Sequence, residues 1–187
     1  KVGDHGAIYA LLAPAVERFG ELSSQEQHDF RGQLTDYVRL YAFLAQVLTF
    51  ADQEHPDLHL TQPSLMNIMK QAGYKTFWVT NQQTLSGRNT MLTNFSQQTD
   101  EQVYLNHTRS QNSYNFDEEV LEPFARILQD PAERKFIVVH LLGTHMVYEY
   151  RYPSEFGVFK DKTGLPGWVT DSQLPLINHY DNAVRYN

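Results

Sequence analysis

The chain has 187 residues, no cysteine and a formal net charge of −7 at pH 7. This length accommodates one ordinary domain, or a smaller domain with an appendage, but not two complete enzymes. The absence of cysteine excludes disulfides and thiolate metal sites, and it leaves the compartment open. The chain has 22 acidic and 15 basic residues, so its overall negative charge repels phosphate backbones. We therefore expect no nucleic-acid partner.

The hydrophobic fraction of 41% and the aromatic fraction of 13% are typical of a globular protein with a packed core. The sequence has no run of about 18 apolar residues. Its first residues also lack the basic, apolar and small-residue order of a signal peptide. The chain therefore predicts neither a membrane-spanning helix nor a secretory signal.

Residues 1–52 are predicted to form a helical segment. Apolar residues recur at helical spacing over residues 7–19. Ser23, with Glu26 three positions later, matches a capping box that opens an amphipathic helix predicted to run to about residue 50. A polar, proline-containing stretch follows and suits a linker, so we place a domain boundary at residues 52/53.

Helices and strands alternate through the second predicted domain, residues 53–187. Such alternation predicts an α/β fold with a mostly parallel sheet. Asp117 is favourably placed in the first turn of one of these helices, near the positive end of the helix dipole. The expected elements are a short helix opening at Ser64, a strand over 75–80, a short strand over 102–105, a helix over 116–128, a strand over 136–142 and a last helix from about residue 173.

The most informative stretch is residues 135–145, KFIVVHLLGTH, where an apolar strand runs directly into a polar loop. In an open α/β sheet ligands bind outside the carboxyl ends of the strands, which is where His145 is expected to lie. A surface-loop histidine without function is the alternative for His145. His140 lies inside the apolar run, so a core histidine with satisfied hydrogen bonds is as good an interpretation as a role in the site.

Four motifs carry a resemblance to a known family. They read QAGYKTFWVTNQ at 71–82, HLLGTH at 140–145, YRYP at 150–153 and YDNAVRYN at 180–187. In order and spacing they resemble the catalytic domain of bacterial phosphoethanolamine transferases, in the sulfatase and alkaline phosphatase superfamily. The resemblance covers residues 58–187 and implies a partial alkaline-phosphatase/sulfatase-like fold.

The resemblance also implies roles for three residues. His145 matches the second histidine of the family's His-Gly-His-type loop, so the resemblance implies a catalytic histidine that faces the phosphoryl group or a second zinc. Asn81 and Gln82 match the family's substrate-facing loop, so with His145 they are implied to bind the transferred head group. Plain turn residues are an equal alternative for Asn81 and Gln82. We predict no metal ligand in this chain.

The cofactor implied by the resemblance is zinc. The implied partners are a phospholipid head-group donor and, as acceptor, lipid A or another envelope glycolipid, at the periplasmic face of the inner membrane. The family's nucleophile and its Asp-His-Gly-Glu-type metal motif have no match in this chain, so we expect it to be inactive alone and to bind zinc weakly. Unpaired sheet edges further predict marginal stability and self-association.

A second resemblance concerns residues 7–50. The runs LLAPAVERF at 11–19 and DYVRLYAFL at 36–44 are similar to the C-terminal helical region of the R subunit of type I restriction enzymes. In that family the region is a scaffold, so the resemblance implies no catalytic residue. The alternative function is therefore a helical interaction module that carries the α/β part as a passenger.

Other polar residues have simpler interpretations. His55 and His59 are four residues apart, as metal ligands on one helix would be, but Pro56 between them argues against that helix. We expect both to be solvated linker histidines. Asp181 and Asn182, in the last predicted helix, are interpreted as capping or packing groups rather than ligands.

Overall fold

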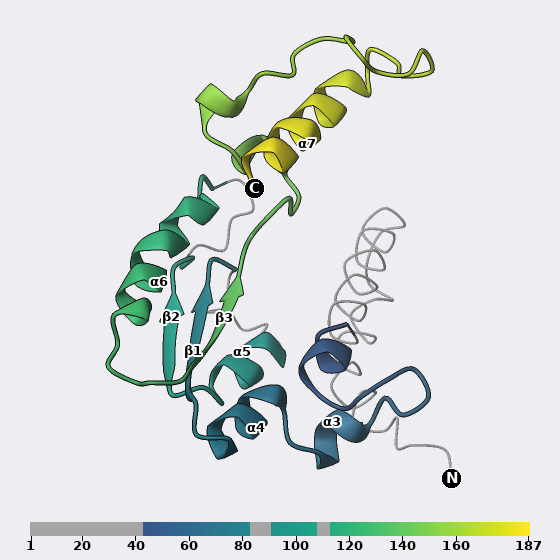
Figure 1. The fold of residues 1–187 in the computed structure, drawn as a ribbon. Coiled ribbons are helices and arrows are strands. Elements are labelled where there is room, and N and C mark those ends of the chain that lie inside the picture. The colour runs from purple at the N-terminus through teal and green to yellow at the C-terminus, as the bar shows by residue number, and fades with distance from the viewer. Residues whose placement is uncertain (1–42, 83–90, 108–112) are drawn as a thin grey trace, which may run out of the picture. The chain divides into compact units, whose positions relative to one another are not determined.

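The computed structural model describes residues 43–82, 91–107 and 113–187 (Figure 1). The chain divides into two compact units, with the division between Ile68 and Met69. The boundary predicted at residues 52/53 lies inside the first unit. Most of the predicted helical segment 1–52, including its capping box, lies outside the described residues. Within the described residues, no helix is both long enough and apolar enough to cross a membrane.

The described part of the first unit is helical and short. It contains a helical turn over residues 43–48, α3 (Leu58–Thr61) and the beginning of α4 (Leu65–Gln71), which ends in the second unit. Ser64 opens α4 as predicted, because its Oγ accepts a hydrogen bond from the amide of Asn67 at 3.3 Å. His59 Nδ1 bonds the carbonyl of Pro56 at 2.6 Å, and His55 pairs with Asp52 at 3.3 Å. The two histidines therefore have separate local partners.

The second unit is built on three parallel strands, β1 (Lys75–Thr80), β2 (Glu101–Tyr104) and β3 (Lys135–His140), in the order β2-β1-β3. Figure 1 shows the three arrows pointing to the same end. The run KTFWVT suits the central strand because β-branched and aromatic side chains pack well on both faces of a sheet. The predicted α/β class with a parallel sheet is confirmed.

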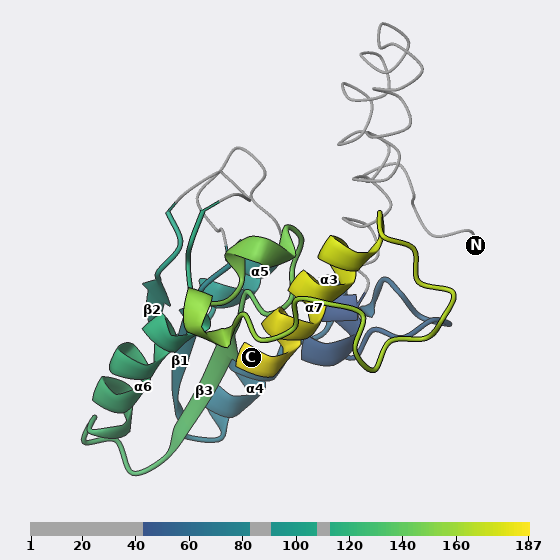
Figure 2. The ribbon, with the colours of Figure 1, turned by 90° about the horizontal axis from the view of Figure 1, so that it is seen from above.

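Helices cover both faces of this sheet (Figures 1 and 2). On one face Phe77 and Val79 form a core cluster with Val120 and with Ile127 of α6 (Leu121–Leu128). Side chains alternate across a strand, so Tyr104 points to the other face, where its hydroxyl bonds Ser96 of α5 (Met91–Ser96) at 2.7 Å. The remaining elements are the 3-10 helices η1 (Asp117–Val120), η2 (Tyr148–Tyr150) and η3 (Ser154–Phe156), and α7 (Leu174–Tyr186).

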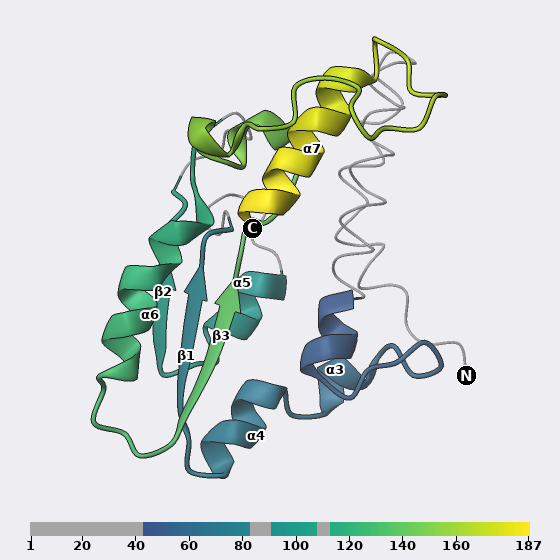
Figure 3. The same cartoon turned by 45° about the horizontal axis from the view of Figure 1, so that its top comes forward.

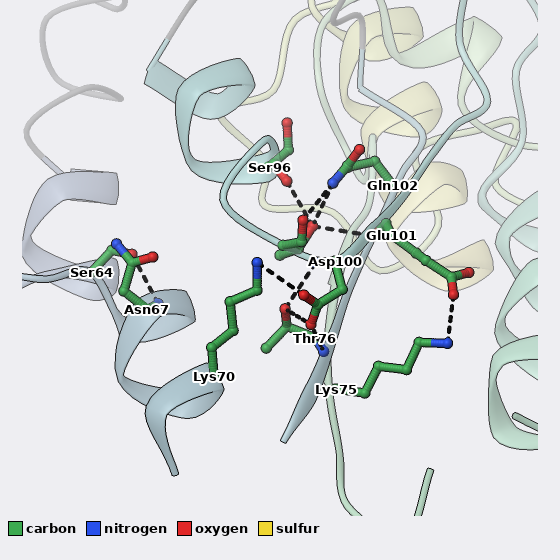
Figure 4. A network of polar contacts seen from close by, with 10 residues as sticks. Ser64, Asn67, Lys70, Lys75, Thr76, Ser96, Asp100, Glu101 and Gln102 are labelled. Carbon is green, nitrogen blue, oxygen red and sulfur yellow. Dashed lines mark hydrogen bonds and ion pairs between the residues drawn. The ribbon is translucent and has the colours of Figure 1, made fainter. Parts of the chain in front are cut away.

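The amino end of the sheet is fixed by Asp100 (Figure 4). Its carboxylate accepts hydrogen bonds from the amide and the hydroxyl of Thr76, both at 2.8 Å, and an ion pair from Lys70 at 3.0 Å. Burial is the largest single influence, and it raises the pKa of Asp100. The bonds from Thr76 and Lys70 together lower the pKa by more, so that it lies below its usual value. The start of β2 is thereby attached to β1 and to the end of α4.

We expect Asp100→Ala to lower the free energy of unfolding by about 2 kcal/mol at pH 7, because it leaves the Thr76 amide and hydroxyl without their acceptor. Asp171→Ala is the matched control. Its carboxylate is 93% exposed and pairs with Lys162, and such surface pairs contribute little to stability. Denaturant titration followed by tryptophan fluorescence measures both.

The pH dependence of this difference follows from the lowered pKa. The Asp100 contribution is fully present above the unfolded-state pKa of about 4, and it is lost as the pH falls through the lower pKa of the folded state. The difference in the free energy of unfolding between wild type and Asp100→Ala should therefore become smaller as the pH falls below about 4. An equal loss in the two alanine variants at pH 7 would contradict this account of the sheet.

Candidate functional site

The site lies at the carboxyl end of the sheet (Figure 3). Thr80, the last residue of β1, stands beside His140, the last residue of β3, in the parallel register. The segments that follow the two strands therefore emerge at the same edge. One of them starts with Asn81 and the other, residues 141–147, carries His145. Ligands bind at this edge in open α/β sheets, so the structure brings the predicted site residues to the expected place.

Asp117, in η1, holds the two segments together. Its Oδ1 accepts hydrogen bonds from the Leu142 amide and from the Asn81 side-chain amide, both at 2.8 Å, and its Oδ2 accepts one from the Gly143 amide at 2.5 Å. Hydrogen bonds to a charged acceptor are roughly twice as strong as neutral ones. Gly143 adopts a φ of +60°, a conformation that glycine reaches at little cost. One carboxylate thus fixes the beginning of the loop after β3.

Arg151 fixes the other end of the loop. Its side chain is 2% exposed, and its guanidinium donates to the carbonyls of His145 at 2.9 Å, Met146 at 3.2 Å and Ser113 at 3.2 Å. Burial lowers the pKa of Arg151, and the negative charge of Asp117 opposes that shift. The backbone on both sides of the His145 side chain is therefore held by charged groups.

The imidazole of His145 is exposed, and its Nδ1 lies 3.0 Å from the Met146 carbonyl oxygen. A carbonyl oxygen only accepts hydrogen bonds, so this contact places the hydrogen of the neutral ring on Nδ1. Nε2 then carries a lone pair. Such a ring can accept a proton at Nε2, and the protonated ring can donate one from the same atom.

His140 is partly buried between the two strands. Its Nδ1 lies 3.3 Å from the Thr80 hydroxyl, and its ring packs against Trp78 with the centroids 6.3 Å apart. Burial lowers the pKa of His140, and the charge of Asp117 partly offsets the shift. These are the contacts of a packed, neutral histidine.

The two amides predicted to face substrate have different surroundings. Asn81 is fully buried, donates to Asp117, and its Oδ1 has no hydrogen-bond partner among the described residues. Gln82 is partly exposed, and its side-chain amide donates to the Leu141 carbonyl at 3.1 Å. Both amides support the neighbouring backbone of the site. In this structure Asn81 lies beneath the surface, so its contact with a transferred group remains a prediction.

The described residues do not gather the ligands of a metal site. Across residues 43–82, 91–107 and 113–187, no three histidine, aspartate or glutamate side chains lie close enough to hold a metal ion. Zinc sites in proteins use three or four ligands. The described residues by themselves therefore do not fit a zinc ion.

Sequence reasoning did not assign Asp117 or Arg151 to the site. Asp117 was interpreted only as a helix first-turn acid, and Arg151 only as part of a motif. The available clue was the combination of Arg151, a residue type that is rarely buried, with the loop of His145 six residues earlier. Asn182, interpreted as a capping or packing group, packs against the loop before α7. Its amide bonds the backbone of residues 158 and 159.

Known proteins match most of this chain in sequence. Residues 22–187 match the family model described as Sulfatase. The chain is 54% identical over 159 residues to the phosphoethanolamine transferase EptC of Escherichia coli K12, a match that covers 84% of this chain and 28% of that protein. It is 54% identical over 155 residues to the phosphoethanolamine transferase CptA of Salmonella typhimurium LT2, which covers 82% and 27% respectively.

The chain is also similar to a solved structure of the same family of transferases. The crystal structure of the C-terminal periplasmic domain of Escherichia coli EptC, in complex with Zn, superposes with a TM-score of 0.74 at 56% identity, over 78% of this chain and 41% of that one. The chain thus spans just over a quarter of the length of its curated relatives. The family match starts at residue 22, inside the segment that resembles the restriction R subunit, and that second resemblance remains a prediction.

The role of Asp117 can be tested by Asp117→Asn. An asparagine offers one carbonyl oxygen where the aspartate offers two, so the amide of Leu142 or Gly143 loses its acceptor. We expect the free energy of unfolding to fall by about 2 kcal/mol. We also expect hydrogen exchange of these two amides to accelerate at least about tenfold, as that free energy implies.

The matched control is Glu118→Gln, which removes an exposed carboxylate from the same turn of η1. It should change neither stability nor exchange at the loop beyond about 0.5 kcal/mol. Unchanged exchange at Leu142 and Gly143 in Asp117→Asn would show that the carboxylate does not hold the loop.

Proposed function

Because the chain belongs to the sulfatase family, we propose that it forms part of the catalytic domain of a phosphoethanolamine transferase and that His145 is its catalytic residue. One observation carries the proposal. The His145 backbone is held between Asp117 and Arg151 at the carboxyl edge of the sheet, and its Nε2 lone pair is directed away from the Met146 carbonyl. Such preorganisation lets a side chain act without reorganising during the reaction.

In the proposed reaction, the bond from phosphorus to the donor oxygen breaks and a bond from phosphorus to the acceptor oxygen forms. The acceptor hydroxyl loses a proton, and the leaving oxygen gains one. A neutral His145 accepts a proton at Nε2. A protonated His145 donates one there and offsets negative charge on the phosphoryl oxygens. Asn81 and Gln82, which follow β1, are proposed to contact the head group, and Asn81 also bonds Asp117.

The substrates are proposed from the relatives. The donor is the head group of a phospholipid, and the acceptor is lipid A or another envelope glycolipid, at the periplasmic face of the inner membrane. Two relatives at 54% identity are named phosphoethanolamine transferases, and the solved relative is a periplasmic domain. These names support the head group and the compartment.

We propose that zinc binds to the complete domain rather than to this chain alone. The solved relative is a complex with Zn, whereas the described residues here contain no cluster of three potential ligands. We propose that this chain alone binds zinc weakly and does not turn over.

The alternative, a helical interaction module related to the restriction R subunit, rests on residues 7–50. The structure describes only the last few of them, residues 43–50.

A chimera tests the role of His145. The matching part of Escherichia coli EptC is replaced by the corresponding residues of this chain, and transfer of phosphoethanolamine is measured. We expect the chimera to be active and His145→Ala within it to lower kcat about 100-fold or more, the usual contribution of a positioned acid or base. His55→Ala, at an exposed histidine paired with Asp52, is the control and should retain full activity.

The chain alone is assayed in parallel with added zinc. We expect no turnover above background and no stoichiometric, tight heat of zinc binding, because three or four ligands are needed. An active chimera in which His145→Ala retains full activity would reject the catalytic role. Turnover by the chain alone would reject the proposal that it is inactive.

A further inference from the structure

The helix α7 exposes apolar side chains and buries polar ones. Its outer side carries Leu176, Tyr180 and Val184, which are 44–60% exposed and spaced four residues apart, so they lie on one face of the helix. The opposite side buries Asn178 and Asn182. A surface helix normally has the reverse arrangement, with its apolar side toward the core. The outer side of α7 therefore has the composition of an interaction surface.

Hydrogen bonds explain why α7 keeps its polar side inward. Asn182 accepts hydrogen bonds from the amides of Val158 and Phe159 at 3.0 and 2.9 Å, and it donates to the Phe159 carbonyl at 3.0 Å. Its amide also donates to the Tyr152 hydroxyl at 3.4 Å. These buried polar groups satisfy one another, so this side of the helix is stable without apolar contacts. The outward direction of the apolar side is thus fixed by the fold.

The apolar side of α7 continues into the loop of His145. The ring of Tyr180 meets the ring of Tyr148 edge to face, with the centroids 5.2 Å apart. Tyr148 follows Met146 and Val147, which are 62% and 39% exposed and come directly after His145. We define the α7 patch as the five exposed side chains of Met146, Val147, Leu176, Tyr180 and Val184. Because α7 lies beyond the carboxyl end of the sheet (Figures 1 and 3), the α7 patch adjoins the candidate site.

The size of the α7 patch argues against a second protein chain as its partner. Its side chains are 39–62% exposed, which leaves on the order of 500 Å² open in total, at roughly 200 Å² for each large side chain. A stable protein–protein interface buries about 800 Å² on each partner. A lipid surface has no such requirement, because a few apolar and aromatic side chains inserted at the head-group boundary give reversible binding.

The chemistry of the α7 patch suits the boundary between lipid head groups and acyl chains. Tyr180 presents an apolar ring with a hydroxyl group, and such amphipathic rings are enriched at this boundary. Along the chain the patch is flanked by Glu149, Asp181 and Arg185, two acids and one base. The patch thus has no excess of positive charge for anionic lipids, and its contacts with lipid are apolar.

We propose that the α7 patch docks on the surface of a phospholipid bilayer and brings the loop of His145 to the lipid head groups. Because Met146 directly follows His145, contact of the patch with lipid places the imidazole beside the head groups. The inference deepens the proposed function and rests on it for the role of the phospholipid as donor. Docking itself requires no catalytic step.

Sedimentation with lipid vesicles tests the proposal. The chain is mixed with vesicles of equal parts phosphatidylcholine and phosphatidylethanolamine, and the bound fraction is measured against lipid concentration. We expect reversible partitioning that changes less than about twofold between about 0.1 and about 0.5 M salt, because salt screens charges and leaves apolar contacts in place. A second set of vesicles that contains phosphatidylglycerol measures any contribution of anionic lipid.

Two leucine variants form a matched pair. Leu176→Asp should weaken partitioning at least about tenfold, the effect of losing most of the burial of one leucine. Met146→Asp, at the other end of the patch, should repeat this loss. Leu128→Asp is the control, at a leucine that is 56% exposed at the end of α6. Leu128 comes two residues before Asp130, which bonds Lys75 at the start of β1, so it belongs to the amino end of the sheet and its substitution should leave binding unchanged. Circular dichroism verifies that the variants keep the fold.

Three results would overturn the docking surface. They are the absence of partitioning, equal losses in Leu176→Asp and Leu128→Asp, and binding that requires phosphatidylglycerol and disappears at high salt. A dimer in analytical ultracentrifugation that Leu176→Asp abolishes would assign the patch to a second copy of the chain, and it would also reject the proposal.

The outcome is separable from that of the proposed function. Partitioning that Leu176→Asp weakens, together with a chimera that is insensitive to His145→Ala, would reject the catalytic proposal and leave the docking surface intact. A chimera that depends on His145, together with a chain that does not partition, would reject the docking surface and leave the catalytic proposal intact.

Discussion

The Asp117 carboxylate is the interaction on which the rest of the site depends. Its two oxygens bond both the segment after β1, through Asn81, and the loop after β3, through Leu142 and Gly143. Its charge also opposes the cost of burying the Arg151 guanidinium. A buried charge without a partner would be strongly destabilising, so the carboxylate and the carbonyls around Arg151 together make that burial tolerable.

The same region is connected to α7 by aromatic contacts. The Tyr186 hydroxyl accepts the amide of Glu118 in η1 at 3.2 Å, and its ring meets Phe116 and Phe156 edge to face. Edge-to-face pairs of this kind each add about 0.5–1.5 kcal/mol beyond the burial of their area. Further pairs join Tyr114 to Phe116 and Tyr150. The 3-10 helix that carries Asp117 is therefore also connected to α7, through the hydroxyl of Tyr186.

Much of the fold could be predicted from the sequence, because it depends on local patterns. The strand over 75–80 was predicted at its observed bounds, and α7 begins within one residue of the predicted position. The second strand is observed at Glu101–Tyr104, one residue earlier than predicted, and β3 ends at His140, two residues before the predicted end. Strand ends depend on pairing with neighbours, which periodicity does not contain.

The site was less predictable, because its supports are distant in sequence. Asp117 is 36 residues from Asn81 and 26 from Gly143, and no local pattern relates such positions. Burial of Arg151 depends on carbonyls that only the folded loop brings together. His145, by contrast, was identified because a strand-end position and a motif agreed. Sequence reasoning thus found the residue at the surface and missed the two charged groups beneath it.

A double-mutant cycle between Asp117→Asn and Arg151→Met tests the central claim most directly. The free energy of unfolding of the wild type, both single variants and the double variant is measured by denaturant titration. If the two charges act on one loop as a unit, the single losses will fail to add, with a coupling free energy of at least about 1 kcal/mol. Losses that add to within about 0.5 kcal/mol would show that the two residues act independently, and they would contradict the account.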